Sequence, residues 1–265
     1  MLRSLKDLER YTVVASDGEL GRVANFLFDD ERWAIRYLVV EPTLFFQGPR
    51  VLISPVLFRR ADWATRSFHL ALTQEQIRKS PSVDTDKPVS RQHERDHFRY
   101  YGYPYYWAYS GLWGLGNYPG LLAPWDEPRP AHEEPIGDVH LRSAREVTGY
   151  DIQGTDGAIG DVVDFAVDDE TWALRYLVVD TSHGWFGKKV LVAPEWASRI
   201  SWTEKKVYVA LTREAIKTSP AWDPAAAIHR QYESQLYDHY GRAAYWAKDQ
   251  PPQATSAQHS GRESA

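Results

Sequence analysis

The chain has 265 residues, with 31 Lys or Arg and 36 Asp or Glu, and it contains no cysteine. This length accommodates two domains of ordinary size. The lack of cysteine excludes disulfide bonds, thiolate zinc sites, iron–sulfur clusters and cysteine nucleophiles. Charges of both signs are interspersed, so no segment has the basic surplus typical of nucleic-acid binding, and no nucleic-acid partner is expected.

The sequence contains no recognisable targeting or membrane-spanning segment. Residues 1–11 are rich in charged side chains and lack the apolar stretch of a signal peptide. No apolar run approaches the roughly 18 residues that a membrane-spanning helix requires. We therefore expect a cytoplasmic protein, with peripheral contact as the one form of membrane association left open.

The dominant feature of the sequence is an internal repeat. Shifted by 139 positions, residues 2–107 (the first unit) align without a gap on residues 141–246 (the second unit), and about forty aligned positions are identical. The longest matching stretch is Trp-Ala-x-Arg-Tyr-Leu-Val-Val, at 33–40 and 172–179. Its β-branched and aromatic residues predict a buried central strand. A repeat of this length indicates a duplicated, domain-sized unit.

Each unit is predicted to begin with a helical turn and to continue as five short strands. Asp17-Gly18 is a turn signal between the first two strands. Thr73 is a good N-cap for a helix after the last strand. In the first unit the helical turn covers residues 4–8, and the strands cover 11–15, 20–29, 33–40, 51–54 and 67–72.

Five short strands joined by tight turns within about 70 residues suggest a small closed barrel, because closure removes exposed strand edges. The predicted fold class is mainly β with short helices, as two small β-barrels in tandem, each followed by C-terminal helices. The expected boundaries are 1–84 for the first barrel, 85–107 for its helical extension, 108–138 for a linker rich in Gly, Pro and aromatic residues, 139–223 for the second barrel, 224–247 for its extension and 248–265 for a disordered tail.

Several motifs resemble those of the PRC-barrel family. They are Asp-Gly-x-x-Gly at 17–21, an apolar strand ending in Asp-Asp-Glu at 29–31, Trp-x-x-Arg-Tyr-Leu-Val-Val at 33–40 and Gly-x-x-Val-Leu-x-x-Pro at 48–55, and all recur in the second unit. The family includes the cytoplasmic domain of the photosynthetic reaction-centre H subunit and the C-terminal domain of the ribosome-maturation factor RimM. Similarity to tandem PRC-barrel proteins of bacteria extends through 87–92 and 100–104. The resemblance implies barrels that contact other proteins, and it supplies no catalytic residues.

Two longer helices are predicted outside the strands, at 90–101 and 224–240. Asp223-Pro224 is a strong start signal for the second helix. Each helix carries a stripe that is expected to pack on a barrel, with an exposed dimer surface as the alternative. The stripes are His93, His97 and Tyr100-Tyr101 in the first helix, and Tyr232, Leu236 and Tyr240 in the second.

The linker is unusual because Tyr, Trp, Gly and Pro dominate it. Dense Gly and Pro interrupt regular structure, whereas the aromatic residues argue against a purely solvated tether. We expect partial docking of this segment along the barrels. The alternative is an aromatic surface that meets a partner or a membrane.

His93-Glu94-x-x-His97 matches the zincin motif, in which two His on one helix face bind zinc and the Glu acts as general base. The intervening Arg95 and Asp96 are charged, whereas zincins are usually apolar there. The second unit has Tyr232 and Leu236 at the two His positions. We therefore predict no metal and no cofactor, with a zinc metalloprotease as a remote alternative.

Two arginines lie in the middle of the apolar repeated strands. A charge in such a place needs a partner, and we expect Asp29 for Arg36 and Asp168 for Arg175. The structural ion pair is the favoured interpretation, and an exposed arginine that binds a partner is the alternative. The acidic turns that contain these aspartates are predicted to be solvated rather than to bind a cation.

The sequence predicts a non-enzymatic interaction or scaffold protein with a protein partner of unknown identity. Two copies would provide avidity, either as a homo-oligomer or as an intramolecular pair of barrels. The alternative follows the H-subunit resemblance: a peripheral component of photosynthetic or other membrane electron transfer. The sequence shows no counterpart of the transmembrane helix of the H subunit, which counts against this alternative.

Overall fold

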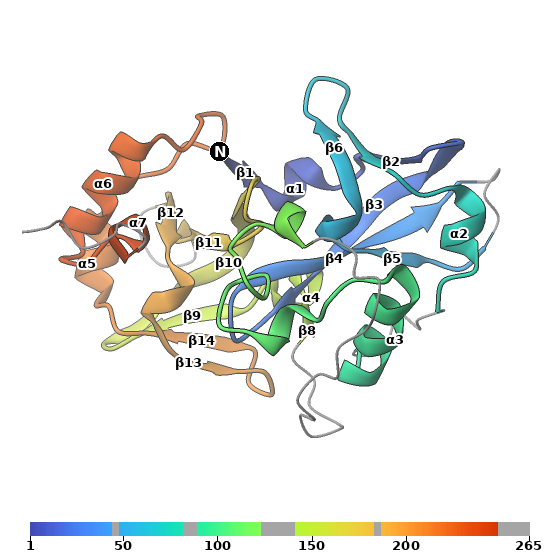
Figure 1. Cartoon of the computed structure of the whole chain (residues 1–265). Helices are drawn as coiled ribbons and strands as arrows, with labels where there is room; N and C mark the ends of the chain where they lie inside the picture. The colour runs from blue at the N-terminus through green and yellow to red at the C-terminus, as the bar shows by residue number, and fades with distance from the viewer. Residues whose placement is uncertain (44–47, 82–88, 123–140, 183–186, 249–265) are drawn as a thin grey trace, which may run out of the picture.

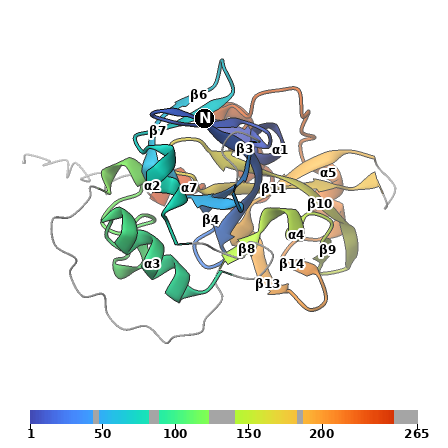
Figure 2. The same ribbon diagram turned by 90° about the vertical axis from the view of Figure 1, so that its right-hand side faces the viewer.

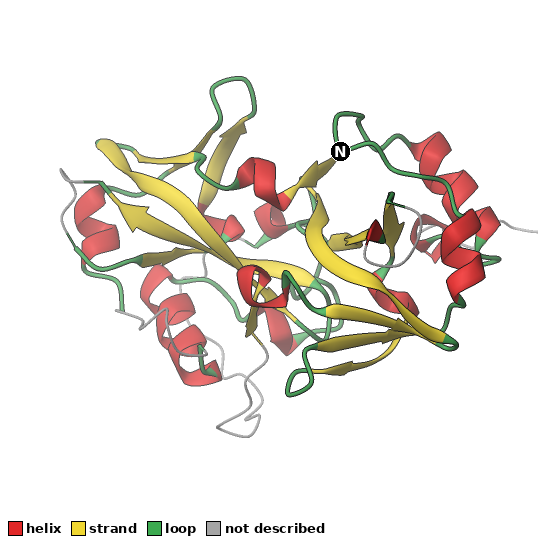
Figure 3. Cartoon of the chain, turned by 180° about the vertical axis from the view of Figure 1, so that it is seen from behind, coloured by secondary structure: helices red, strands yellow, loops and turns green. Residues whose placement is uncertain are grey.

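The computed structural model describes all residues except 44–47, 82–88, 123–140, 183–186 and 249–265 (Figure 1). The fold is mainly β, with two seven-stranded sheets; several short helices lie toward the outer ends of the molecule, and others lie between the sheets (Figure 3). The first half contains β1 (Leu2–Ser4), α1 (Leu5–Leu8), β2 (Thr12–Ala15), β3 (Gly18–Asp29), β4 (Ala34–Pro42), β5 (Val51–Ile53), η1 (Pro55–Leu57), β6 (Phe58–Asp62), β7 (Ser67–Leu70), α2 (Gln74–Arg78), α3 (Arg91–Tyr101), η2 (Tyr106–Ala108) and η3 (Pro119–Leu121).

The second half repeats this order of strands and helices. It contains β8 (Leu141–Ser143), α4 (Ala144–Val147), β9 (Asp151–Gly154), β10 (Gly157–Asp168), β11 (Leu174–Asp180), β12 (Lys189–Val192), η5 (Pro194–Trp196), β13 (Ala197–Ser201), β14 (Lys206–Val209), α5 (Arg213–Thr218), α6 (Arg230–His239) and α7 (Tyr245–Lys248). Among the described residues, no helix is long and apolar enough to cross a membrane.

Most predicted elements of the first unit are confirmed, and their local signals explain them. Ser4 caps α1 through its hydroxyl, and Thr73 forms a reciprocal capping box with Gln76 at the start of α2. The strands β1 and β6 were not predicted. The predicted start at Asp223-Pro224 is wrong, because the Asp223 carboxylate accepts the N–H of Ala225 in a local turn and α6 begins only at Arg230.

The order of paired strands is the same in both sheets. It is β5-β4-β3-β2-β7-β6 in the first and β12-β11-β10-β9-β14-β13 in the second. The predicted closed barrels are not found, because no described ladder joins the two ends of either order. In each unit a short 3₁₀ helix follows the end strand, and it begins at Pro55 after β5 and at Pro194 after β12. Because proline has no N–H to donate to a strand partner, the ladder does not continue through these positions.

The seventh strand of each sheet comes from the other half of the chain. β1 pairs with β10, and β8 pairs with β3, with Leu2 opposite Asp168 and Leu141 opposite Asp29. These two registers are identical under the 139-residue shift. Figure 1 shows β1 beside the second sheet, and Figures 1 and 2 show β8 close to the strands of the first. The two units therefore exchange their first strands.

Hydrogen bonds between the two β-turn regions join the units at the centre. The N–H of Ile35 donates to Trp172 O at 2.8 Å, and the N–H of Leu174 donates to Trp33 O at 2.7 Å. The Trp172 ring packs on Phe68 of the first unit, with ring centroids 5.8 Å apart. The core of the molecule thus continues from one unit into the other.

Candidate interaction site

A buried ion pair lies at the end of the β3–β4 hairpin. Arg36 is fully buried, and its Nη2 lies 2.9 Å from Asp29 Oδ2, with Nε of the same arginine donating to that oxygen at 3.3 Å. Asp29 is thus the partner that the sequence suggested for Arg36. Burial acts to raise the pKa of Asp29, but the charge and hydrogen bonds of Arg36 outweigh it and hold that pKa below its usual value.

The hairpin turn itself fixes the position of Asp29. Its Oδ1 accepts the backbone N–H groups of Glu31 at 2.9 Å and Arg32 at 3.2 Å. A carboxylate that closes a turn onto its own backbone is a common role for Asp, and here the second oxygen remains directed at Arg36. The same aspartate therefore organises the turn and neutralises the buried guanidinium.

Helix α3 and the segment after it add a second buried charge pair. Glu94 accepts a hydrogen bond from Arg91 Nη1 at 2.9 Å and another from the Tyr106 hydroxyl at 2.7 Å. The Tyr106 ring also lies 3.7 Å from the Arg36 guanidinium, which joins the two pairs into one cluster. Burial raises the pKa of Glu94 to about 6, against the opposing effect of Arg91.

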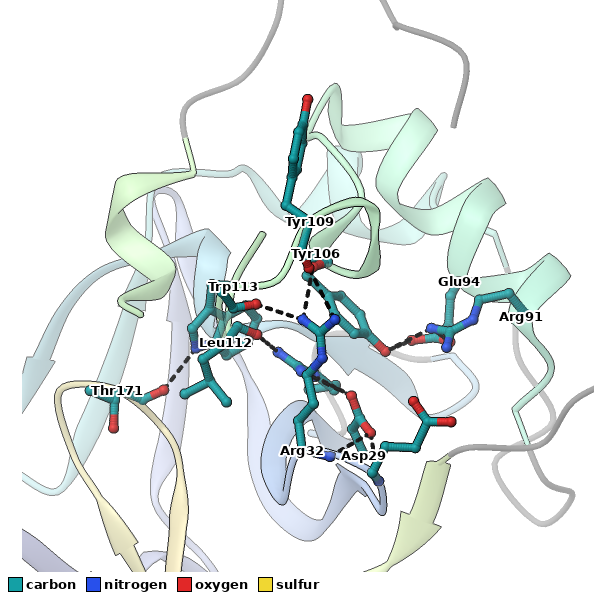
Figure 4. A network of polar contacts seen from close by, with 12 residues as sticks. Asp29, Arg32, Arg91, Glu94, Tyr106, Tyr109, Leu112, Trp113 and Thr171 are labelled. Atoms are coloured by element: carbon teal, nitrogen blue, oxygen red, sulfur yellow. Dashed lines mark hydrogen bonds and ion pairs between the residues drawn. The ribbon is translucent and has the colours of Figure 1, made fainter. Parts of the chain in front are cut away.

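The linker covers this cluster, as Figure 4 shows. Leu112 O accepts Arg36 Nη1 at 2.7 Å, and the Trp113 ring lies 4.7 Å from the same guanidinium. The Trp113 indole N–H donates to Thr171 O of the second unit at 2.7 Å. Arg32 Nη2 donates to Tyr109 O at 3.0 Å. The predicted docking of the linker on the repeated units is therefore confirmed for residues 108–122, and the remainder of the linker lies outside the described residues.

The outer side of the docked segment is apolar and exposed. Leu115 and Leu121 have exposed fractions of 76% and 70%. A pocket of about 200 Å³ opens beside them, and residues 104–122 contain no charged side chain. We call this surface the apolar face. The pocket is lined by Pro104, Tyr105, Tyr109, Trp113, Leu115, Gly116, Leu121 and Leu122.

The second unit contains a related cluster with fewer contacts to its arginine. Glu233 accepts the hydroxyls of Tyr176 and Tyr245 at 2.9 Å each, and Arg230 Nη1 lies 3.1 Å from the same carboxylate. Arg175, the counterpart of Arg36, keeps 20% of its side chain exposed and lies 4.0 Å from Asp168. No described segment covers Arg175 as Leu112 and Trp113 cover Arg36.

Sequence reasoning missed the buried Arg-Glu-Tyr cluster. The signal was present, because the repeat keeps the spacing Arg-x-x-Glu at 91–94 and 230–233 and keeps Tyr-Trp at 106–107 and 245–246. The stripes predicted on the two helices are borne out in part, because His97, Tyr101, Tyr232, Leu236 and Tyr240 pack on the core, whereas Tyr100 is exposed. The buried side chains are Arg91, Glu94, His97 and Phe98 in α3, and Glu233, Leu236 and Tyr237 in α6.

The zincin-like motif of α3 has other contacts in the structure. His97 is buried, and its Nε2 donates to Leu52 O at 3.1 Å, while Glu94 belongs to the cluster above. The Nδ1 of His93 lies 3.0 Å from the Ser90 hydroxyl at the N-terminal end of the helix. Within the described part of the chain, no group of three or more His, Cys, Asp or Glu residues is arranged to hold a metal ion.

No protein-family model matches the chain, and no curated protein matches it either. The resemblance to the PRC-barrel family therefore rests on the repeated motifs alone.

Proposed function

We propose that the chain is a non-enzymatic scaffold that binds a protein partner through its apolar face, and that its two units are tandem, modified PRC-type domains. The main support for this proposal is the exposure of Leu115 and Leu121 beside an uncharged aromatic pocket. Contiguous apolar surface of this kind marks interaction sites on folded proteins, because its exposure to water is unfavourable.

The buried cluster supports this proposal by explaining how the apolar face is held. Arg36 binds Leu112 O, and Trp113 bonds to Thr171 O, so the segment is fixed at two points. A rigid segment loses little conformational entropy on binding, which favours affinity. Glu94 and Arg36 are residue types that occur in active sites. Here both side chains are buried and ion-paired, which suits an anchoring role.

The partner is expected to present an apolar side chain rather than a charged patch. The absence of charge in 104–122 leaves the pocket without a group that would recognise an ion. A leucine or aromatic anchor that fills such a pocket, surrounded by a water-excluding rim, is the usual form of an energetic hot spot.

The test is a quantitative pull-down from a lysate of the source cell with full-length protein. We expect the double variant Leu115→Lys/Leu121→Lys to capture at least tenfold less of a defined set of proteins than the wild type does. The matched control is Thr203→Lys/Ala227→Lys, which adds the same charge at exposed positions of the second unit. Circular dichroism verifies that both variants fold.

Two outcomes would overturn this proposal. In the first, both variants capture the same proteins as the wild type. In the second, wild-type protein floats with phospholipid vesicles and the Leu115/Leu121 variant does not, which would assign the apolar face to a membrane.

A further inference from the structure

Arg36 and Arg175 are equivalent by the 139-residue shift, yet within the described part of the chain only Arg36 donates hydrogen bonds. The guanidinium of Arg36 donates to Asp29 and to Leu112 O and contacts the rings of Tyr106 and Trp113. Arg175 lies 3.9 Å from the Tyr245 ring and 4.0 Å from Asp168, and its buried Nε has no hydrogen-bond partner among the described residues.

We propose that Arg175 forms a peptide-binding site, which accepts from a partner protein a segment that offers a backbone carbonyl followed by a tryptophan. The docked Leu112-Trp113 pair of this chain is the template for that ligand, since it occupies the equivalent place in the first unit. A carbonyl would accept from a terminal Nη of Arg175, as Leu112 O accepts from Nη1 of Arg36, and the indole would pack on the guanidinium.

The surroundings of Arg175 are already in place. Arg230 lies 3.1 Å from Glu233 and 4.1 Å from the Trp246 ring, matching Arg91 with Glu94 and Trp107 in the first unit. Tyr245 holds its hydroxyl on Glu233 at 2.9 Å. A site whose groups are fixed before binding requires little reorganisation.

The sequence indicates that the ligand of Arg175 is not the segment of this chain that corresponds to Leu112-Trp113. The positions 139 residues after Leu112 and Trp113 are Pro251 and Pro252, and residues 249–265 contain no Phe, Trp or Tyr. In addition, Thr171 replaces Arg32, which binds linker carbonyls in the first unit. The second site thus lacks the clamp that makes docking permanent, as expected for a ligand that binds reversibly.

The test uses a defined peptide and the full-length protein. The probe is Ser-Gly-Leu-Trp-Gly-Leu-Gly, residues 110–116 of this chain, with a fluorescent label at its N-terminus and an amidated C-terminus. Fluorescence anisotropy should show saturable binding. We expect Arg175→Gln to weaken binding at least tenfold, and replacement of the peptide tryptophan by alanine to do the same.

The control is Arg199→Gln, which changes an exposed arginine of the same unit and should leave the affinity within twofold. If Arg175→Gln does not fold, Arg175→Lys keeps the charge but loses the planar fork, and it should still weaken binding several-fold.

The proposal is overturned if the peptide does not bind, if Arg175 variants bind it as the wild type does, or if only Leu115→Lys/Leu121→Lys weakens binding. The inference rests on the proposed interaction role only in choosing a peptide as ligand. Because the probe is defined, its failure is distinguishable from a failure of the pull-down on the apolar face.

Discussion

Arg36 and Arg175 provide a comparison of one side chain in two surroundings. Removal of Arg36 as Arg36→Met leaves the carboxylate of Asp29 buried without its partner, and we expect a loss of about 3–5 kcal/mol in the free energy of unfolding. The longer, partly exposed pair of Arg175 with Asp168 should cost less than about 1 kcal/mol in Arg175→Met. Urea unfolding at neutral pH measures both values, and equal losses would contradict this account.

His97 should make the stability sensitive to acid. Burial lowers its pKa from 6.5 to about 4, so the neutral ring is favoured in the folded state. A lowered pKa contributes stability above pH 6.5 that is lost as the pH falls toward 4, by about 3 kcal/mol over that interval, since one pKa unit corresponds to about 1.4 kcal/mol.

The measurement is urea unfolding from pH 7 to pH 4 of the wild type and of His97→Leu, which places there the residue that the second unit has at Leu236. The raised pKa of Glu94 has the opposite effect, because its contribution is lost as the pH rises from 4.5 to about 6. Both proteins contain Glu94, so its contribution cancels in the difference between their free energies of unfolding. The stability of the wild type minus that of the variant should fall by about 3 kcal/mol on acidification. A constant difference would show that His97 does not titrate as described.

At the level of the elements, Gly21 allows β3 and β4 to approach each other closely. A Cβ atom at this position would lie 2.0 Å from Glu41 O, a backbone atom that cannot move aside alone. Gly160 has the same contact with Asp180 O in the second unit. We expect Gly21→Ala to lower the free energy of unfolding by at least about 2 kcal/mol.

The control for this prediction is Gly120→Ala in η3, where a Cβ would meet no atom within 4 Å. Its effect should remain within about 0.5 kcal/mol in the same thermal or urea experiment. A Gly21→Ala protein as stable as this control would mean that the two strands can separate without penalty.

The elements with strong local signals could be predicted from the sequence. Asp17-Gly18 fixes a hairpin, Thr73 caps a helix, and the two repeated eight-residue stretches contain the central strands. The β6 strand was missed because Arg59 and Arg60 obscure its apolar alternation. The ion pair of Arg36 with Asp29 could be suggested because a buried charge on one strand requires an opposite charge on its neighbour.

The strand exchange could not be predicted, for a reason that belongs to the whole molecule. Leu2-Arg3-Ser4 and Leu141-Arg142-Ser143 are identical, and so are the Asp residues opposite them at 29 and 168. Either strand can therefore pair with either sheet in the same backbone register. Local preferences cannot choose between the two, and the arrangement depends on how the connecting chain places the units.

The same equivalence predicts what the first half would do without the second. A fragment of residues 1–122 has no β8, so its β3 lacks the partner that it has in the full chain. Its own β1 carries the same three residues, and the Ser4 hydroxyl could accept from Asn25 Nδ2 as the Ser143 hydroxyl does at 2.8 Å. We expect two fragments to exchange β1 and form a symmetric dimer, because closed two-fold exchange satisfies both sheets.

Sedimentation velocity of the fragment should give the mass of a dimer at micromolar concentration. Asn25→Leu with Ser4→Ala removes the polar contact of the exchanged strand and should shift the fragment toward monomer. Ser16→Ala, which leaves that strand intact, is the control and should not. A folded monomeric fragment would show that β1 can return to its own sheet, and that the exchange in the full chain is imposed by the linker rather than by the strands.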